Sequence, residues 1–158
     1  MMSELKQGKI RILYVDDEEI NLQAFRSTFK RDYAIFLAVS AKEARKILAD
    51  NEVDIIITDQ RMPVETGLDF LDSIWTKYPD PIRILLTAYT DMLLVTEAIE
   101  KKLIYHYLTK PWDEGYFKNI IQNAFEVYSL RKQNKRLAME LAEARQQLAA
   151  FSKENELS

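Results

Sequence analysis

The chain has 158 residues, of which 47% are hydrophobic and 30% are charged, and its formal net charge is −3. This composition fits one domain with a real core and room for an appendage, and the mild acidity gives no electrostatic reason to expect nucleic-acid binding. The absence of cysteine and the single histidine exclude disulfides, thiolate metal sites and multi-histidine metal sites, and they weigh against a Ser-His-Asp triad.

The first part of the chain alternates apolar, strand-like segments with segments of helical spacing. We predict strands over residues 10–15 and 33–38, and helices over 19–30 and from Ser40 onward. The acids at 16–19 suit a helix start because the helix dipole favours negative charge there. Ser40 followed by Glu43 is typical of a capping box.

Three more strand–helix pairs follow. The strands are predicted over 54–59, 82–86 and 105–108, and the helices over 68–75, over 91–102 and from Trp112. In the helix over 91–102, the spacing of Leu94, Val95, Ala98 and Ile99 predicts that these side chains face the core. Strict alternation with short connections predicts an α/β fold built on a parallel sheet with right-handed crossovers.

The strand over 54–59 is the most informative segment. Three isoleucines in a row, residues 55–57, are typical of a parallel strand that is buried on both faces. Pro63 cannot continue the strand ladder, so the strand must end shortly before it. Asp59 is therefore predicted at the carboxyl end of a central strand, the edge where open α/β sheets bind their ligands.

Polar residues also lie at the ends of the other strands. Asp16 and Asp17 follow the first strand, Thr87 ends the fourth and Lys110 ends the fifth. Three carboxylates without nitrogen or sulphur donors predict a hard-cation site, which Mg²⁺ fits best. A lysine and a hydroxyl opposite the metal would bind phosphoryl oxygens, and Asp59 placed there can be a nucleophile that forms an aspartyl phosphate.

The last helix carries a heptad pattern of apolar residues. One position holds Leu130, Leu137, Ala144 and Phe151, and the other holds Asn134, Leu141 and Leu148. If the second set is a, Asn134 favours a parallel pair, and Glu140 and Arg145 fall at g and the following e, where they can form an interchain ion pair. The pattern predicts a homodimer through this helix; the alternative is a solvated amphipathic tail that lies back on the domain or frays.

Four motifs surround the strand ends. They are Val15-Asp16-Asp17-Glu18, Asp59-Gln60-Arg61-Met62-Pro63 with Gly67, Leu86-Thr87-Ala88, and Tyr107-Leu108-Thr109-Lys110-Pro111-Trp112. Together they resemble the receiver domain of bacterial two-component response regulators, over residues 9–128. The resemblance implies a flavodoxin-like, doubly wound five-stranded parallel sheet of order 2-1-3-4-5. Residues 1–8 would then be a disordered or extended N-terminus, and 129–158 a helical extension that forms a coiled coil or a linker to an output domain.

The resemblance also implies the roles of the acidic residues. Asp59 would accept a phosphoryl group from a sensor histidine kinase or a phosphotransfer protein. Asp17, Asp59 and the backbone carbonyl of Arg61 would hold Mg²⁺, and Asp16 would position the ion mainly through water.

The remaining strand-end residues would read the phosphate. Lys110 would pair with it, Thr87 would hydrogen-bond it, and the aromatic switch residue Tyr107 would turn inward when Thr87 is drawn toward it. Arg61 and Tyr89 occupy the two positions that flank the phosphate in this family and tune its lifetime.

The resemblance also bears on the backbone conformation at two positions. The bond from Lys110 to Pro111 is cis in this family, a conformation that is accessible before proline. Members often carry a small residue, commonly glycine, near the end of the fourth helix, whereas residues 99–103 here are Ile-Glu-Lys-Lys-Leu. The geometry of that turn is therefore left open.

The expected function is a phosphorylation-controlled switch that acts on an output domain or partner protein and catalyses only its own phosphorylation and dephosphorylation. A magnesium-dependent aspartyl-nucleophile phosphatase is an alternative, but it would usually carry a second acid where this chain has Arg61. A phosphorylation-silent dimer scaffold would not need the acidic set. Residues 1–9 lack the apolar run of a signal peptide and no stretch could span a bilayer, so we expect a cytoplasmic protein with no membrane or nucleic-acid partner.

Overall fold

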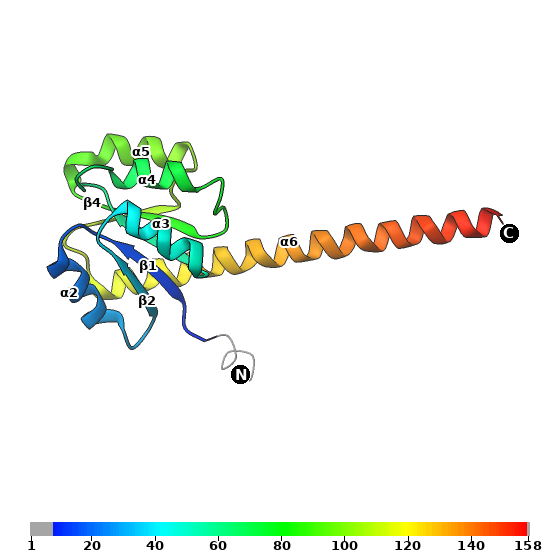
Figure 1. Cartoon of the computed structure of the whole chain (residues 1–158), viewed down its shortest axis with the longest axis horizontal. Coiled ribbons are helices and arrows are strands. Elements are labelled where there is room, and N and C mark those ends of the chain that lie inside the picture. Colours follow the sequence, from blue (N-terminus) through cyan, green and yellow to red (C-terminus); the bar gives the residue numbers. More distant parts are fainter. Residues whose placement is uncertain (1–7, 158) are drawn as a thin grey trace.

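The computed structural model describes residues 8–157, in which a five-stranded parallel sheet has helices on both faces (Figure 1). The strands are β1 (Arg11–Val15), β2 (Ala34–Ala38), β3 (Ile55–Asp59), β4 (Ile82–Thr87) and β5 (His106–Thr109). The helices are α2 (Glu19–Phe29), α3 (Ala41–Asp50), α4 (Gly67–Ile74), the short 3-10 helix η1 (Tyr89–Asp91), α5 (Met92–Glu100) and α6 (Glu114–Leu157). The strand order β2-β1-β3-β4-β5 confirms the predicted flavodoxin-like sheet. The N-terminal segment predicted over 1–8 lies, apart from Gly8, outside the described residues.

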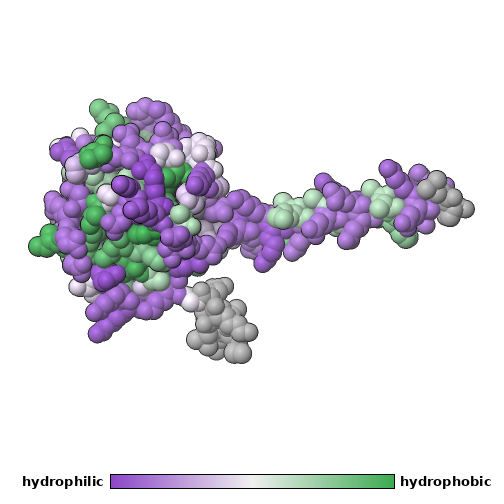
Figure 2. Space-filling view, in the orientation of Figure 1, coloured by the Kyte–Doolittle hydropathy of each residue, from purple (hydrophilic) through white to green (hydrophobic). Residues whose placement is uncertain are grey.

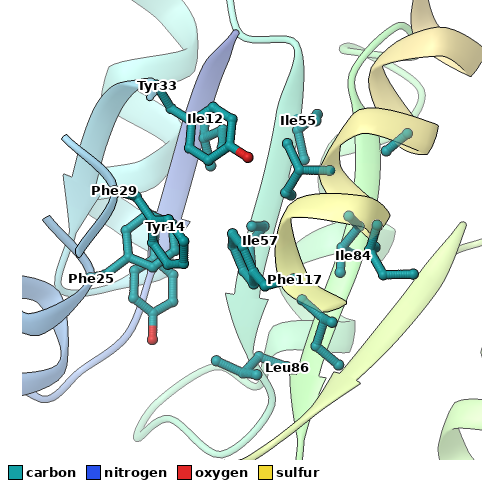
Figure 3. Close-up of a cluster of buried hydrophobic side chains, with 14 of the residues drawn as sticks. Ile12, Tyr14, Phe25, Phe29, Tyr33, Ile55, Ile57, Ile84, Leu86 and Phe117 are labelled. Carbon is teal, nitrogen blue, oxygen red and sulfur yellow. The ribbon is translucent and has the colours of Figure 1, made fainter. Parts of the chain in front are cut away.

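The central strand is buried on both faces, as its three isoleucines predict. Ile55 and Ile57 pack into the cluster under α2 and α6, whereas Ile56 packs into the cluster under α3, α4 and α5. Figure 3 shows the first cluster, where Phe117 of α6 lies beside Ile57 and stacks on Phe29 of α2 with ring centroids 4.4 Å apart. Because β3 is covered on both sides, only residues at its ends can present side chains that a ligand can reach.

The helix starts follow the sequence signals more closely than the helix faces do. The Ser40 hydroxyl accepts a hydrogen bond from the backbone N–H of Glu43 at 3.1 Å, which confirms the predicted cap of α3. The prediction that Leu94 and Ile99 face the core is wrong, because they are 46% and 39% exposed. The buried stripe of α5 consists of Val95 and Ala98, and the two wrongly assigned residues flank it on either side.

The turn from α5 into β5 has the geometry of a glycine-ended helix without a glycine. Lys102 takes a φ of 61°, while its N–H donates to Ile99 and that of Leu103 donates to Ala98. This pattern normally ends in glycine, since a side chain in the left-handed region costs about 1–2 kcal/mol. The Arg83 side chain donates to the Leu103 carbonyl at 2.7 Å and stabilises the turn from β4.

The last helix, α6, has 44 residues and leaves the sheet as a rod (Figure 1). One face of the helix is buried as far as Tyr128, and every side chain from Ser129 to Glu156 is exposed. Lys132 forms an ion pair with Glu52 at 3.2 Å and Lys135 forms one with Asp80, so the start of the extension is tied to the domain. Figure 2 shows the rest as a mainly hydrophilic rod with separate hydrophobic patches. Across the described residues, no helix is both long and apolar enough to cross a bilayer.

Candidate functional site

Three carboxylates meet at the carboxyl edge of the sheet. Asp16 follows β1 and is fully buried, Asp59 ends β3 and is 8% exposed, and Asp17 lies exposed beside them. One carboxylate oxygen from each lies within 4.8 Å of the others. The cluster offers only hard oxygen donors, so its chemistry fits Mg²⁺ better than a softer metal.

Lys110 brings a positive charge into this cluster. It follows β5, and its Nζ lies 3.2 Å from Asp59 Oδ1 and 3.5 Å from Asp16 Oδ2. The peptide bond from Lys110 to Pro111 is cis, as the resemblance to receiver domains implied. One ammonium is thus shared by two carboxylates while a third stands beside them, and the site keeps an excess of negative charge that a cation would neutralise.

The charge excess is reflected in the ionisation of the central groups. Burial raises the pKa of Asp59 and the neighbouring Asp16 and Asp17 raise it further, although Lys110 acts in the opposite direction. Burial lowers the pKa of Lys110, but the carboxylates of Asp59 and Asp16 outweigh that effect and raise it overall. Shifted carboxyl groups in a cleft are typical of functional sites.

Asp16 is held by partners that the sequence did not predict. Its Oδ2 accepts hydrogen bonds from the buried Tyr14 hydroxyl at 2.9 Å and from Asn21 Nδ2 at 3.2 Å, and its Oδ1 accepts the Glu18 N–H at 3.0 Å. Burial, followed by the Asp16 carboxylate, raises the pKa of Tyr14, which keeps its hydroxyl a donor. Asp16 is therefore oriented from three sides.

Gly67 lets α4 approach the end of β3 closely. A Cβ added at Gly67 would lie 2.3 Å from the carbonyl oxygen of Asp59, so any side chain would push the two elements apart. The Gly67 N–H donates to the Gln60 carbonyl, and the Gln60 side chain accepts the N–H of Leu68 at 2.9 Å. This packing fixes the backbone on which Asp59 stands.

Thr87 ends β4 and is buried, with its hydroxyl 3.2 Å from Asp91 Oδ2. Asp91 also pairs with the exposed Arg61 side chain at 3.4 Å. The sequence predicts Asp91 only as the first residue of a helix, because nothing local marks its contact with Thr87. A cavity of about 200 Å³ is lined by Glu18, Asp59, Gln60, Arg61, Thr87, Ala88, Asp91 and Lys110.

The other predicted residues lie on β5, in η1 and along α6. Tyr107 on β5 is partly buried and packs against the cluster under α3, α4 and α5. The backbone of Tyr89 lies in η1, directly after β4, whereas its side chain is outside what the structure describes. The predicted dimer residues Leu130, Asn134, Leu137, Leu141 and Leu148 are exposed along α6, far in sequence from the site.

Comparisons with known proteins agree with this geometry. The sequence profile of the response regulator receiver domain family matches residues 12–122. The hydrogenase transcriptional regulatory protein HoxA of Cupriavidus necator is 34% identical over 82% of this chain, which spans 27% of that protein's length.

Two solved structures have the same fold at similar identity. The signal receiver domain of an HD domain-containing protein from Pseudomonas fluorescens is 34% identical with a TM-score of 0.72. A response regulator receiver domain protein from Clostridium thermocellum is 31% identical with a TM-score of 0.71. Each comparison covers 77% of this chain and 98% of the other. The chain therefore belongs to the receiver domain family of response regulators, the phosphorylation-controlled switches of two-component signalling.

Proposed function

We propose that Asp59 accepts a phosphoryl group from a sensor histidine kinase or a phosphotransfer protein. The observation that carries this proposal is a buried carboxylate at the end of the central strand, 3.2 Å from Lys110 and beside two further carboxylates. An Asp59 oxygen forms the new bond to phosphorus while the bond from phosphorus to the donor imidazole breaks. The chain then catalyses only its own phosphorylation and the later hydrolysis of the acyl phosphate.

Mg²⁺ is the cofactor that this donor set suits. Asp17, Asp59 and the backbone carbonyl of Arg61 would hold it, and Asp16, already engaged by its own donors, would position it through water. The ion, when bound, supplies the positive charge that offsets the phosphoryl oxygens. Lys110 neutralises a further part of that charge from the carboxyl end of β5.

The switch would run from Thr87 to Tyr107. A phosphoryl group on Asp59 adds strong acceptor oxygens next to the Thr87 hydroxyl and Lys110. Movement of Thr87 would free space beside β5, into which the partly buried Tyr107 ring would turn. The face formed by α5, β5 and α6 would change in response, and an output domain or partner protein would read it.

Arg61 and Tyr89 are proposed to tune the phosphate lifetime, because Arg61 lines the cavity beside Asp59 and the Tyr89 backbone follows the switch residue Thr87 by two residues. Replacing Tyr89 with alanine should change the dephosphorylation rate, which is timed by the decay of the phosphorylated mass after the donor is removed. An unchanged lifetime would remove Tyr89 from this role.

We propose that residues 9–128 form the receiver and that 129–158 are an extension through which two copies pair. The support is an exposed apolar stripe along α6 that includes Leu130, Leu137 and Leu141. At 100° per residue the stripe lies across the helix from Lys132 and Lys135, which face the domain. Two copies can therefore join their stripes without losing their own domain contacts.

The dimer is tested by sedimentation of single variants. Leu137→Glu or Leu141→Glu places a charge in the proposed seam and should convert a dimer to a monomer. Met139→Glu is the matched control, since Met139 is 66% exposed on the other side of the same helix turn. A wild-type monomer, or equal dissociation in all three variants, would contradict the coiled coil.

The phosphoryl-transfer proposal is tested by incubation with Mg²⁺ and acetyl phosphate, followed by mass spectrometry. One phosphoryl group per chain is expected, and it should be lost in Asp59→Asn but kept in Asp72→Asn, an exposed carboxylate on α4. Repeated turnover of small phosphomonoesters would instead indicate a hydrolase. An absence of any adduct would favour the scaffold.

A further inference from the structure

Asp91 lines the cavity beside Asp59 but is not one of the three clustered carboxylates. Its side chain is 14% exposed and lines the cavity together with Asp59 and Lys110. Asp91 is the last residue of η1, directly before α5, and it approaches the site from the side of β4. A further carboxylate in a site that must receive an anion calls for a physical explanation.

The first contact of Asp91 is with the switch hydroxyl. Thr87 Oγ1 lies 3.2 Å from Asp91 Oδ2 and 3.3 Å from the Ala88 carbonyl oxygen. A threonine hydroxyl has one hydrogen to donate, and a carboxylate is the stronger acceptor of the two. While that hydrogen points at Asp91, it cannot be donated to a phosphoryl oxygen on Asp59.

The second contact of Asp91 is with Arg61. The guanidinium Nε lies 3.4 Å from Asp91 Oδ2, and Nη2 lies 3.4 Å from Oδ1 and 3.2 Å from the Thr90 hydroxyl. Arg61 stands two residues after Asp59, and this pair holds its side chain at the start of α5. The same guanidinium is a natural partner for phosphoryl oxygens.

We propose that Asp91 is a positioning residue that competes with the phosphoryl group for Thr87 and Arg61. In the unmodified chain it retains both; a phosphoryl group offers each a stronger acceptor and repels the Asp91 carboxylate. Asp91 thereby sets how much binding energy the phosphoryl group must supply before the switch moves. This inference rests on the proposed phosphorylation of Asp59.

Beryllofluoride, which mimics the phosphoryl group, provides the test. The full chain is titrated at saturating Mg²⁺ and the apparent affinity is followed by tryptophan fluorescence. Loss of one hydrogen bond and one exposed ion pair in Asp91→Ala should tighten binding about three- to tenfold. Asp91→Asn, which keeps an acceptor for Thr87, should give a smaller gain. Glu97→Ala, which removes the same charge from an exposed site on α5, should bind as the wild type does.

A double-mutant cycle separates positioning from a merely structural effect. If Asp91 acts through Thr87, most of the gain from Asp91→Ala should disappear in a Thr87→Val background. An undiminished gain there, or equal affinities of wild type and Asp91→Ala, would overturn this inference and leave the phosphorylation of Asp59 standing. A wild-type chain that forms no Asp59-dependent adduct would overturn both.

Discussion

The strand β3 has a buried aspartate at each end, and the two differ in how completely their carboxylates are paired. Asp54, just before the strand, is 2% exposed, and Asp59, its last residue, is 8% exposed. Asp54 receives the backbone N–H of Arg11 at 2.8 Å together with the guanidinium Nε and Nη2 at 3.2 and 2.7 Å. Among the described side chains, the Asp59 carboxylate is paired only with Lys110, which it shares with Asp16.

The difference separates a structural carboxylate from a reactive one. A buried charge that is fully paired by a fork of donors is fixed in place and has no capacity left for a ligand. A buried carboxylate among other carboxylates is kept in place by the fold although the charges repel one another. A cation that binds there relieves this repulsion, so the group remains available for a ligand. Residue type and burial are nearly the same at the two ends, so pairing alone distinguishes them.

The largest effect is expected from breaking the paired end. Arg11→Ala leaves the Asp54 carboxylate buried without its partner and should lower the free energy of unfolding by about 2–3 kcal/mol, measured by urea denaturation. Arg31→Ala, which removes an exposed arginine after α2, is the control. A loss below about 0.5 kcal/mol would mean that pairing does not distinguish the two ends of β3.

Neutralising Asp59, which only shares Lys110 with Asp16, should have the opposite effect on stability. Asp59→Asn removes like-charge repulsion and should raise the free energy of unfolding at pH 7 by about 1–2 kcal/mol in EDTA. Because burial and the neighbouring acids raise the pKa of Asp59 above its ordinary 3.8, its stabilising contribution is full below pH 3.8 and is lost as pH rises through the raised value.

The advantage of Asp59→Asn should therefore grow with pH above 3.8 and vanish below it. Denaturation midpoints measured between pH 3.5 and 7, beside Asp72→Asn, check the sign. An advantage that is independent of pH would show that repulsion is not its cause.

Mg²⁺ should offset the repulsion at Asp59 and thereby stabilise the folded protein. At about ten times its dissociation constant, Mg²⁺ should stabilise the wild type by about 1.4 kcal/mol through linkage. Asp59→Asn should gain much less, whereas Asp72→Asn should gain fully in thermal unfolding. Equal gains in all three would place the ion elsewhere.

The smallest effect on stability is expected at Glu52, which lies at the surface beside the pair of Arg11 and Asp54. Glu52 pairs with Arg11 at 3.0 Å and with Lys132 at 3.2 Å, yet its side chain is 64% exposed. Glu52→Gln should change the free energy of unfolding by less than about 0.5 kcal/mol, because solvent screens such pairs. A loss above about 1 kcal/mol would mean that Asp54, Arg11 and Glu52 act as one unit.

The sequence predicts what depends on the order of the elements. Parallel strands bring their carboxyl ends to one edge, so the meeting of Asp16, Asp59, Thr87 and Lys110 follows once the strands are recognised. The contact between Thr87 and Asp91 depends on how a short helix turns after β4, and no local pattern encodes it.

Helix faces show the same limit. Apolar spacing identifies α5 as a helix, but the width of its buried stripe depends on the neighbours that cover it, and Leu94 and Ile99 lie just beyond them. The left-handed turn at Lys102 is held by the Arg83 side chain, which the sheet brings there and which donates to the carbonyl groups of Leu103 and Lys102. Sequence spacing alone cannot supply such a partner.

The continuity of α6 has a mechanical consequence. The helix begins four residues after Lys110, is anchored in the core by Phe117 and Ile121, and continues unbroken beyond Tyr128. At 1.5 Å per residue, the part beyond Lys135, the last residue that is paired with the domain, is a lever arm of roughly 33 Å. A tilt of about 10° at the anchored end would carry the tip through roughly 6 Å, so a small adjustment beside the aspartates becomes a displacement as large as the radius of a helix with its side chains.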